Sequence, residues 1–600
     1  MKRSLILPLC LCLLAIAGCA SGAGGGGKVA NVILFVPDGL RAAVVEPALA
    51  PTFAVVRDQG VNFANPHAMY PTFTTPNATA MATGHYLGDT GEFANTIYPG
   101  FSSAFGGATL TPFMEHDEVL REVNDHYEGN FLNEESLIAA ARAAGYSTAA
   151  IGKLGPVALQ DVTAYGSGQT VVIDDDTGNG GWPVPADVKT AIKAAGLSPT
   201  PPGSPRGKPN TAQQAYFVDV VAKVLLPRFK AAKKPFFIVF WSRDPDGTQH
   251  SQNDSPGQLT PGINGPTSLA AIKNADTSLA GLRAALKAQG LDGSTNIVVT
   301  ADHGFATIAK DSKTSYAAKQ SYTKLAQGQG PVPKNELPPG FLAIDLAHAL
   351  GLPLFDPDSF KAPVKAGQYP RRGSGLIGKN KDAPDVIVAA NGGSDLIYLP
   401  SDKAQKLARK IVAALLKQDY VSGLFVDDAL GEIPGTLPLS AINLKGAAKL
   451  PAPSILVNFR SFDTGCGMPL RCGVSIADAT LGTGQGMHGS FSRAETANFQ
   501  AAIGPDFKRG YRSDAPSSNA DVGRTIAQLL KLDIPAKGKL VGRVLTESLK
   551  GGPATVSAQI DTIRGPEADG IATELRLQRV GDTLYFDAAG FPGRTLGLAP

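Results

Sequence analysis

The sequence predicts an α/β fold: a doubly wound, mostly parallel sheet with helices on both faces. Three apolar runs, residues 31–37, 236–241 and 296–301, lack polar alternation and are typical of strands buried on both faces of a parallel sheet. Apolar side chains follow helical spacing over residues 217–225 and 269–286, just before the second and third runs. This alternation of strands and helices predicts the doubly wound architecture.

The N-terminus predicts a lipoprotein signal. Residues 1–18 begin with Met1-Lys2-Arg3, continue with an apolar stretch too short to span a membrane, and end before Cys19 in a cleavage box. We expect cleavage there and a lipid anchor on the Cys19 thiol. Ala20 carries no charge that would favour inner-membrane retention, so we expect the outer membrane, facing the periplasm. Residues 19–28 are expected to form a flexible tether.

The rest of the chain divides into a core and two additions. We expect the α/β core in residues 29–310 and 440–550, an inserted cap in residues 311–439 with a helix near 402–418, and a small strand appendage in residues 551–600. Pro227 is expected to bend or end its helix, and Cys466 and Cys472 to form a disulfide. The hydrophobic content of 43% fits a globular chain, and the net charge of +3 implies no nucleic-acid partner.

Each apolar run leads to an aspartate. Asp38 follows the first run, Asp246 lies beyond the second and Asp302 follows the third. Because ligands of such sheets bind at the carboxyl ends of the strands, we expect these carboxylates to converge on one edge. Converging carboxylates repel one another and raise each other's pKa unless a cation lies among them.

Histidines accompany these aspartates. His250 follows Asp246 by four residues, His303 follows Asp302 directly, and His488 lies in a glycine-rich segment. A mixture of nitrogen and oxygen ligands suits zinc and leaves positions open for water or substrate. The sequence therefore predicts two Zn²⁺ ions, about 3.5–4 Å apart in centres of this kind.

A hydroxyl nucleophile is predicted just before a probable helix. In Thr74-Thr75-Pro76-Asn77, the proline suits a first helical turn and a preceding threonine can cap it. A hydroxyl at a helix N-terminus lies in positive potential, which favours an alkoxide and a bound phosphate. Thr74 and Thr75 are both candidates on this ground, with a metal ion supplying the remaining activation.

These motifs together resemble bacterial nucleotide pyrophosphatases/phosphodiesterases of the alkaline phosphatase superfamily. The family's Thr-x-Pro-Asn motif falls on Thr74 and so selects it over Thr75 as the nucleophile. Its phosphoryl-binding asparagine falls on Asn95. Its Asp-x-x-x-His falls on Asp246 and His250, its Asp-His-Gly on residues 302–304, and its late histidine loop on residues 486–489.

The resemblance implies an alkaline-phosphatase-like fold and a two-zinc phosphoric ester hydrolase that acts through a phosphothreonine on Thr74. By resemblance, Asp246, His250 and His488 hold one zinc. The resemblance assigns the other zinc to Asp38, Asp302 and His303, with the Thr74 oxygen beside it. The substrate would be a small-molecule phosphate ester with a phosphodiester or pyrophosphate bond.

The resemblance leaves the substrate class open. Nucleotide-cleaving relatives often have an aromatic residue directly after the nucleophile, where this chain has Thr75, but Trp241 stands where the family often has an aromatic wall of the substrate pocket. Lys153, at the end of another short strand, resembles the lysine with which threonine-dependent monoesterases bind a terminal phosphate. The second basic residue of that pattern is replaced by Gly155. Phosphomonoester hydrolysis is therefore the alternative.

A surface lipoprotein that kept the fold only as a binding module is the rival from another class, and it predicts a broken metal set. The intact set counts against it. Of the other histidines, His85 is a weak candidate for substrate contact, whereas packing or surface roles are expected for His67, His116, His126 and His348.

Overall fold

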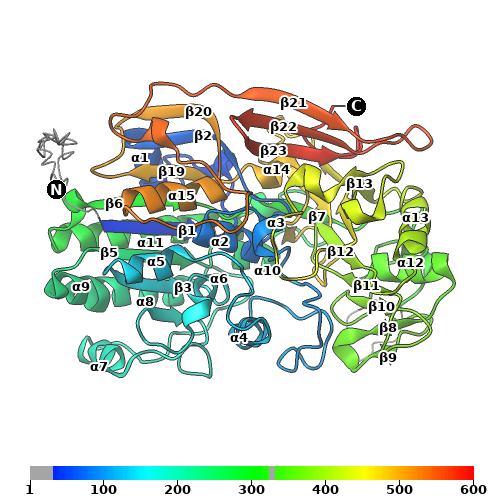
Figure 1. Cartoon of the computed structure of the whole chain (residues 1–600), viewed down its shortest axis with the longest axis horizontal. Helices are drawn as coiled ribbons and strands as arrows, with labels where there is room; N and C mark the ends of the chain where they lie inside the picture. Colours follow the sequence, from blue (N-terminus) through cyan, green and yellow to red (C-terminus); the bar gives the residue numbers. More distant parts are fainter. Residues whose placement is uncertain (1–30, 323–330, 600) are drawn as a thin grey trace, which may run out of the picture.

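The computed structural model describes residues 31–322 and 331–599. The predicted signal of residues 1–18, the tether of residues 19–28 and the Cys19 anchor lie outside the described residues. Within the described part, the chain forms a large core sheet, a second large sheet and two smaller ones (Figure 1). No helix in that part is both long and apolar enough to cross a membrane.

The core sheet is doubly wound and mostly parallel, as predicted. All of its pairings are parallel except those of β19, which runs antiparallel to β2 and β6. In spatial order the strands are β20 (Tyr511–Ser518), β2 (Val61–His67), β19 (Gln500–Ile503), β6 (Thr295–Thr300), β1 (Asn31–Pro37), β5 (Phe236–Ser242), β3 (Ser147–Gly152) and β4 (Val171–Asp174).

Both faces of this sheet are covered, which explains why its central strands are apolar throughout. On β1, Ile33 and Phe35 belong to one apolar cluster, whereas Val32, Leu34 and Val36 belong to another. The first cluster includes side chains of α1 (Pro51–Gln59), α7 (Ala186–Ala194), α8 (Thr211–Val220), α9 (Leu226–Ala232) and α11 (Pro266–Ala288). The second includes side chains of α2 (Thr74–Thr83), α4 (Asp117–His126), α5 (Leu137–Ala143), α6 (Pro156–Leu159) and α15 (Asn519–Leu529).

The helix before β5 does not end near Pro227. A π-helical turn, Val221–Leu225, joins α8 to α9, and Pro227 lies in the first turn of α9. A proline has no N–H to donate to the carbonyl four residues before it, and its ring would clash with that carbonyl. The wider π-helical turn before Pro227 accommodates the ring, so the helix continues past the proline.

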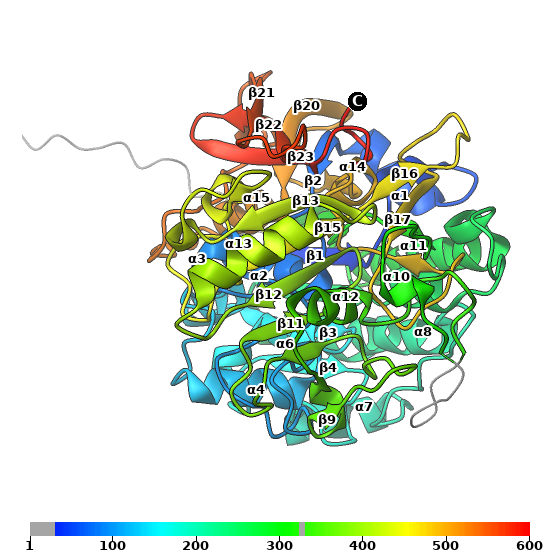
Figure 2. The same ribbon diagram turned by 90° about the vertical axis from the view of Figure 1, so that its right-hand side faces the viewer.

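A second sheet forms the inserted region, on the right of Figure 1. Its inner face contributes Leu376, Ile387 and Leu396 to the core cluster, and α12 and α13 cover its outer face (Figure 2). The sheet extends past the predicted limit at residue 439, because β15 lies between β12 and β13. Its order is β14 (Leu437–Pro438), β13 (Val421–Val426), β15 (Ile455–Phe459), β12 (Ser394–Tyr398), β11 (Val386–Ala389), β10 (Gly375–Ile377), β8 (Leu354–Asp356) and β9 (Ala362–Pro363), with helices α12 (Phe341–Leu350) and α13 (Ala404–Leu415).

Two smaller sheets complete the described part. One has the order β16 (Ser461–Asp463), β17 (Gly473–Ile476), β7 (Ala306–Ala309) and β18 (Gly486–Met487), and a Cys466–Cys472 disulfide closes the loop between its first two strands. The other is antiparallel and consists of β21 (Gln559–Arg564), β22 (Glu574–Val580) and β23 (Thr583–Gly590), within the predicted C-terminal appendage.

Candidate metal centre

The strand ends of the core sheet bring the predicted carboxylates to one edge. Parallel pairing sets Pro37 beside Ser242, so Asp38 begins the loop after β1 and its N–H donates to the Ser242 carbonyl at 3.1 Å. The Asp246 N–H in turn donates to the Asp38 carbonyl at 3.0 Å. Asp302 follows β6, the other neighbour of β1, and accepts from the Gly39 N–H at 2.9 Å. The predicted convergence is therefore present.

The three carboxylates keep oxygens without donors. Asp38 Oδ1, Asp246 Oδ1 and Asp302 Oδ2 are buried, and no donor hydrogen-bonds to them in the described part of the chain. Buried carboxylate oxygens normally accept hydrogen bonds, and leaving one without a donor is costly. These oxygens are thus directed at a position where a cation fits.

Each of the three predicted histidines is held by a backbone carbonyl at its Nδ1 atom. The Nδ1 atoms of His250, His303 and His488 lie 2.8 Å from the backbone carbonyls of Gly486, Gly304 and Thr72, respectively. A carbonyl can only accept, so each Nδ1 carries the proton and each Nε2 offers a lone pair. This arrangement is common among metal-binding histidines, because it fixes the ring and frees one nitrogen for the ion.

Lone pairs of nitrogen and oxygen therefore face one another across the site. His303 Nε2 lies 3.2 Å from Asp302 Oδ2 and 3.7 Å from Asp38 Oδ1, and His488 Nε2 lies 3.4 Å from Asp246 Oδ1. Two acceptors at such distances repel unless a proton or a metal ion lies between them. The donor set, nitrogen with oxygen, suits zinc.

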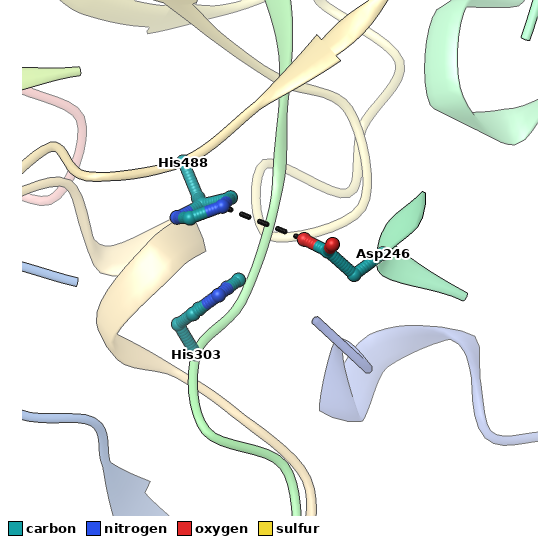
Figure 3. Close-up of side chains that lie close together, drawn as sticks. All are labelled: Asp246, His303 and His488. Carbon is teal, nitrogen blue, oxygen red and sulfur yellow. Dashed lines mark ion pairs between the residues drawn. The ribbon is translucent and has the colours of Figure 1, made fainter. Parts of the chain in front are cut away.

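The close groupings differ in one member from the sets implied by resemblance. Asp38, Asp302 and His303 form one compact group as expected, but the second consists of Asp246, His303 and His488. In Figure 3 the rings of His303 and His488 stack, 3.7 Å apart, opposite Asp246. His250 stands at the edge, with Nε2 3.1 Å from Asp246 Oδ1 and its side chain 22% exposed.

Burial dominates the protonation of this centre. It lowers the pKa of His303 and of His488 to about 3, so both rings are neutral and ready to bind a metal over the physiological range. Burial, together with the Asp246 charge, raises the pKa of Asp38. Burial and the Asp38 charge raise that of Asp302 as well. Such carboxylates ionise readily only when a positive charge lies beside them.

Thr74 lies within this centre at the start of α2. The helix begins at Thr74 itself, two residues before Pro76. The Thr74 hydroxyl lies 3.4 Å from His303 Nε2 and 3.3 Å from Lys153 Nζ. Of the two threonines, Thr75 is directed elsewhere, because its hydroxyl lies within donor distance of Ala94 O and Asn95 Oδ1, at 3.2 and 3.1 Å.

Lys153 is a buried member of the centre. Its backbone N–H donates to the Trp241 carbonyl at 3.0 Å, which continues the β3–β5 pairing by one residue. The side chain therefore lies at the sheet edge that carries Asp38 and Asp246. Its ammonium lies 2.9 Å from Asp38 Oδ2 and 3.4 Å from Asp246 Oδ2. Burial would lower its pKa, but the charges of Asp246 and Asp38 raise it well above the usual value, so the lysine is a cation.

Asn95 is held by a glutamate that sequence reasoning did not identify. Asn95 Oδ1 accepts from the Thr75 N–H at 2.9 Å, and its Nδ2 donates to Glu115 Oε1 at 2.9 Å. The same Glu115 oxygen lies 3.5 Å from Lys153 Nζ. Glu115 lies in a loop outside any strand-end motif, so the sequence carried no signal for it.

Trp241 does not form the expected aromatic wall. The side chain is fully buried under the sheet edge and is absent from the residues that line the pocket. Its Nε1–H donates to Asp38 Oδ2 at 2.7 Å. Because side chains alternate between the two covered faces along β5, the indole packs into the same apolar cluster as Phe237 and Val239 and orients a carboxylate of the centre.

A pocket of about 710 Å³ opens onto the centre. Asn95, Lys153, Asp246, His250 and His488 form part of its lining, whereas Thr74 is fully buried and does not. The inserted region contributes to the opposite wall with Asp358, Arg372, Ser374, Ala390 and Asn391. A substrate in this pocket would therefore contact both the core and the second sheet.

His85 lies away from this pocket. Its Nδ1 lies 2.9 Å from Asp89 Oδ2, and its Nε2 lies 3.6 Å from Glu134 Oε2. These carboxylates accept backbone N–H groups, including Leu540 N–H and Gly538 N–H. The cluster fixes the chain near residues 538–540, so the weak expectation of a substrate contact gains no support.

The sequence of this chain also matches a protein family and two known proteins. A family model described as type I phosphodiesterase / nucleotide pyrophosphatase matches residues 32–406. Venom phosphodiesterases 2 and 1 of Crotalus adamanteus are each 25% identical over 336 residues, which is 54% of this chain. The matches cover only 33% and 32% of those relatives, so the chain spans about a third of their length.

A solved structure also resembles this one. It is murine ectonucleotide pyrophosphatase / phosphodiesterase 5, an inactive variant in complex with AMP, with 16% identity and a TM-score of 0.48. The match covers 85% of this chain and 97% of that one.

Proposed function

The chain belongs to the type I phosphodiesterase / nucleotide pyrophosphatase family, and we propose that it is a two-zinc hydrolase of phosphodiester or pyrophosphate bonds. The nucleophile is the Thr74 hydroxyl, and the covalent intermediate is a phosphothreonine. Similarity to venom phosphodiesterases supports a small-molecule phosphate ester as the substrate.

One observation carries this proposal. Donor-free oxygens of Asp38, Asp246 and Asp302 and ring nitrogens of His303 and His488 converge where the only nearby aliphatic hydroxyl in the described contacts is that of Thr74. Zinc bound there would supply positive charge that lowers the pKa of a hydroxyl and stabilises charge developing on the phosphoryl oxygens.

Thr74, the N-terminus of α2 and Asn95 would carry out the other parts of the reaction. The Thr74 hydroxyl loses its proton to solvent, and its oxygen attacks phosphorus in line with the leaving oxygen, whose P–O bond breaks as the bond to Thr74 forms. The leaving oxygen takes up a proton from solvent. Water then attacks the phosphothreonine, breaks its bond to phosphorus and restores the Thr74 hydroxyl. The N-terminus of α2 favours the phosphate that results. Asn95 keeps an N–H for a phosphoryl oxygen, because Glu115 occupies only one of the two on Nδ2.

The alternative of phosphomonoester hydrolysis rests on Lys153. Its ammonium lies 3.3 Å from the Thr74 hydroxyl, where it could meet the extra charge of a terminal phosphate. We retain it as the second candidate. The lipid anchor on Cys19 and the location at the outer membrane, facing the periplasm, remain part of the proposal on sequence grounds alone.

Replacement of the nucleophile tests the proposal. Thr74→Ala in the zinc-loaded enzyme should lower kcat/KM for a nitrophenyl nucleotide diester by at least about a thousandfold. It should also abolish trapping of labelled phosphate on the protein while zinc content, measured by elemental analysis, stays near normal. Thr79→Ala is the matched control, because its buried hydroxyl donates to Thr75 O within the same helix and has no other hydrogen bond among residues 31–322 and 331–599. Wild-type turnover by Thr74→Ala would refute the assignment.

A further inference from the structure

We propose that Glu115 makes this site selective for singly charged phosphodiesters over doubly charged monoesters, by compensating the charge of Lys153. The inference rests on the proposed function and deepens it, since it favours one of the two substrate classes. Glu115 touches neither predicted metal ligands nor Thr74 in the described contacts, so we assign it as a specificity-determining, positioning residue.

Three carboxylates compete for the Lys153 ammonium. Asp38 and Asp246 lie 2.9 and 3.4 Å from Nζ, and Glu115 lies 3.5 Å from it. Asp38 and Asp246 belong to the centre proposed to bind zinc, and a carboxylate that binds a dication is a weak partner for an ammonium. Both face Lys153 with Oδ2 and keep Oδ1 for a metal, so in the loaded enzyme their charge is shared with zinc, and Glu115 is the one of the three whose charge is not.

The pairing with Glu115 sets the charge that Lys153 presents beside the Thr74 hydroxyl. A free lysine beside the nucleophile would attract the second negative charge of a monoester, as the monoesterase pattern implies. A lysine paired with Glu115 has no net charge to offer, and the glutamate itself repels a third anionic oxygen. A diester, whose third oxygen carries a substituent, suffers no such repulsion.

The loop that carries Glu115 leaves no room for a side chain at residue 155, where the monoesterase pattern has its second basic residue. Gly155 has φ +86°, and a Cβ there would lie 2.6 Å from the Glu115 Cα and 2.7 Å from its carbonyl oxygen. No side chain fits at residue 155 while Glu115 keeps its place. The glycine at residue 155 is therefore required by the path of the loop at residue 115, and the second basic group of that pattern has no room on this side of Lys153.

Asn95 links the same glutamate to phosphoryl binding. The Thr75 N–H fixes Asn95 Oδ1, and Glu115 Oε1 accepts from Nδ2, so the amide cannot turn over. A glutamine at residue 115 could retain this acceptor and lose only the charge. Glu115→Gln therefore separates the electrostatic role from the positioning of Asn95.

The test compares two substrates across matched variants. In Glu115→Gln, the ratio of kcat/KM for nitrophenyl phosphate to that for a nitrophenyl nucleotide diester should rise at least about tenfold, equivalent to about 1.4 kcal/mol. Glu115→Asp, which keeps the charge, should retain a ratio nearer that of the wild type. Glu118→Gln removes the same charge at an exposed position three residues later and should leave the ratio unchanged.

An unchanged ratio in Glu115→Gln, or an equal loss on both substrates, would overturn the proposal. A binding measurement separates this failure from failure of the proposed function. Calorimetry with inorganic phosphate at alkaline pH, where it is mostly doubly charged, should give at least about tenfold tighter binding to zinc-loaded Glu115→Gln than to wild type. If the wild type cleaves neither ester, the proposed function fails, and phosphate affinity alone decides for or against Glu115.

Discussion

Glu92 should make the stability of this protein fall as the pH rises. Its side chain is fully buried, and neither carboxylate oxygen accepts a hydrogen bond in the described part of the chain. Burial raises the pKa of Glu92 from 4.5 to about 8. The Thr75 hydroxyl lies near the carboxylate but forms no regular hydrogen bond with it, because the hydroxyl is within donor distance of Ala94 O and Asn95 Oδ1. It therefore lowers the pKa of Glu92 only in part.

Linkage between protonation and folding gives the sign and the size of this loss of stability. Between pH 4.5 and about 8 the unfolded carboxyl is ionised while the folded one keeps its proton, so the folded state loses about 1.4 kcal/mol per pH unit over this window. From about pH 5 to about pH 8 the loss is about 4 kcal/mol. With an unfolding entropy of about 2.1 cal/mol/K per residue, this corresponds to a Tm difference of about 3 °C for a chain of this length.

Glu92→Gln removes the titration and keeps the shape. Thermal denaturation of both proteins, followed by circular dichroism in parallel buffers, should give a Tm difference that grows by about 3 °C in favour of the glutamine between about pH 5 and pH 8. Comparing the two proteins at each pH cancels effects common to both, zinc binding included. Glu118→Gln, an exposed control, should show no such growth. A difference independent of pH would refute the reasoning.

Two further predictions concern the centre and the strand that carries Lys153. Zinc at about a hundred times each Kd should stabilise the protein by about 2.7 kcal/mol per site, which raises the Tm by about 2 °C for each site. Asp302→Asn should remove one of these two increases in a thermal-shift titration. A wild-type Tm that changes neither with added zinc nor with a chelator would contradict the two-site centre. Gly152→Ala should destabilise the core sheet strongly and abolish turnover, because its Cβ would lie 1.9 Å from the Trp241 carbonyl oxygen at φ +134°; normal melting and activity of this variant would show that β3 and β5 tolerate separation.

The sequence determined the core architecture and the chemistry available to it. Uninterrupted apolar strands such as residues 31–37 can be stable only where both faces are covered, and this requirement fixes a doubly wound sheet. Parallel strands then bring Asp38, Asp302 and Lys153 to one edge, because the chain direction at each strand end is the same. Family membership was also predictable, because the motifs that carry it are contiguous in sequence.

Only the tertiary structure decided what each side chain faces. His488 reaches His303 because the short strand β18 pairs with β7 and sets Met487 opposite Ala306, a register that no local pattern encodes. Trp241 faces the core and orients Asp38, and Glu115 meets Lys153 and Asn95 from a loop without a motif. Strand periodicity fixes which residues share an edge, whereas packing between segments distant in sequence fixes which of them touch, and the charge of this pocket depends on the latter.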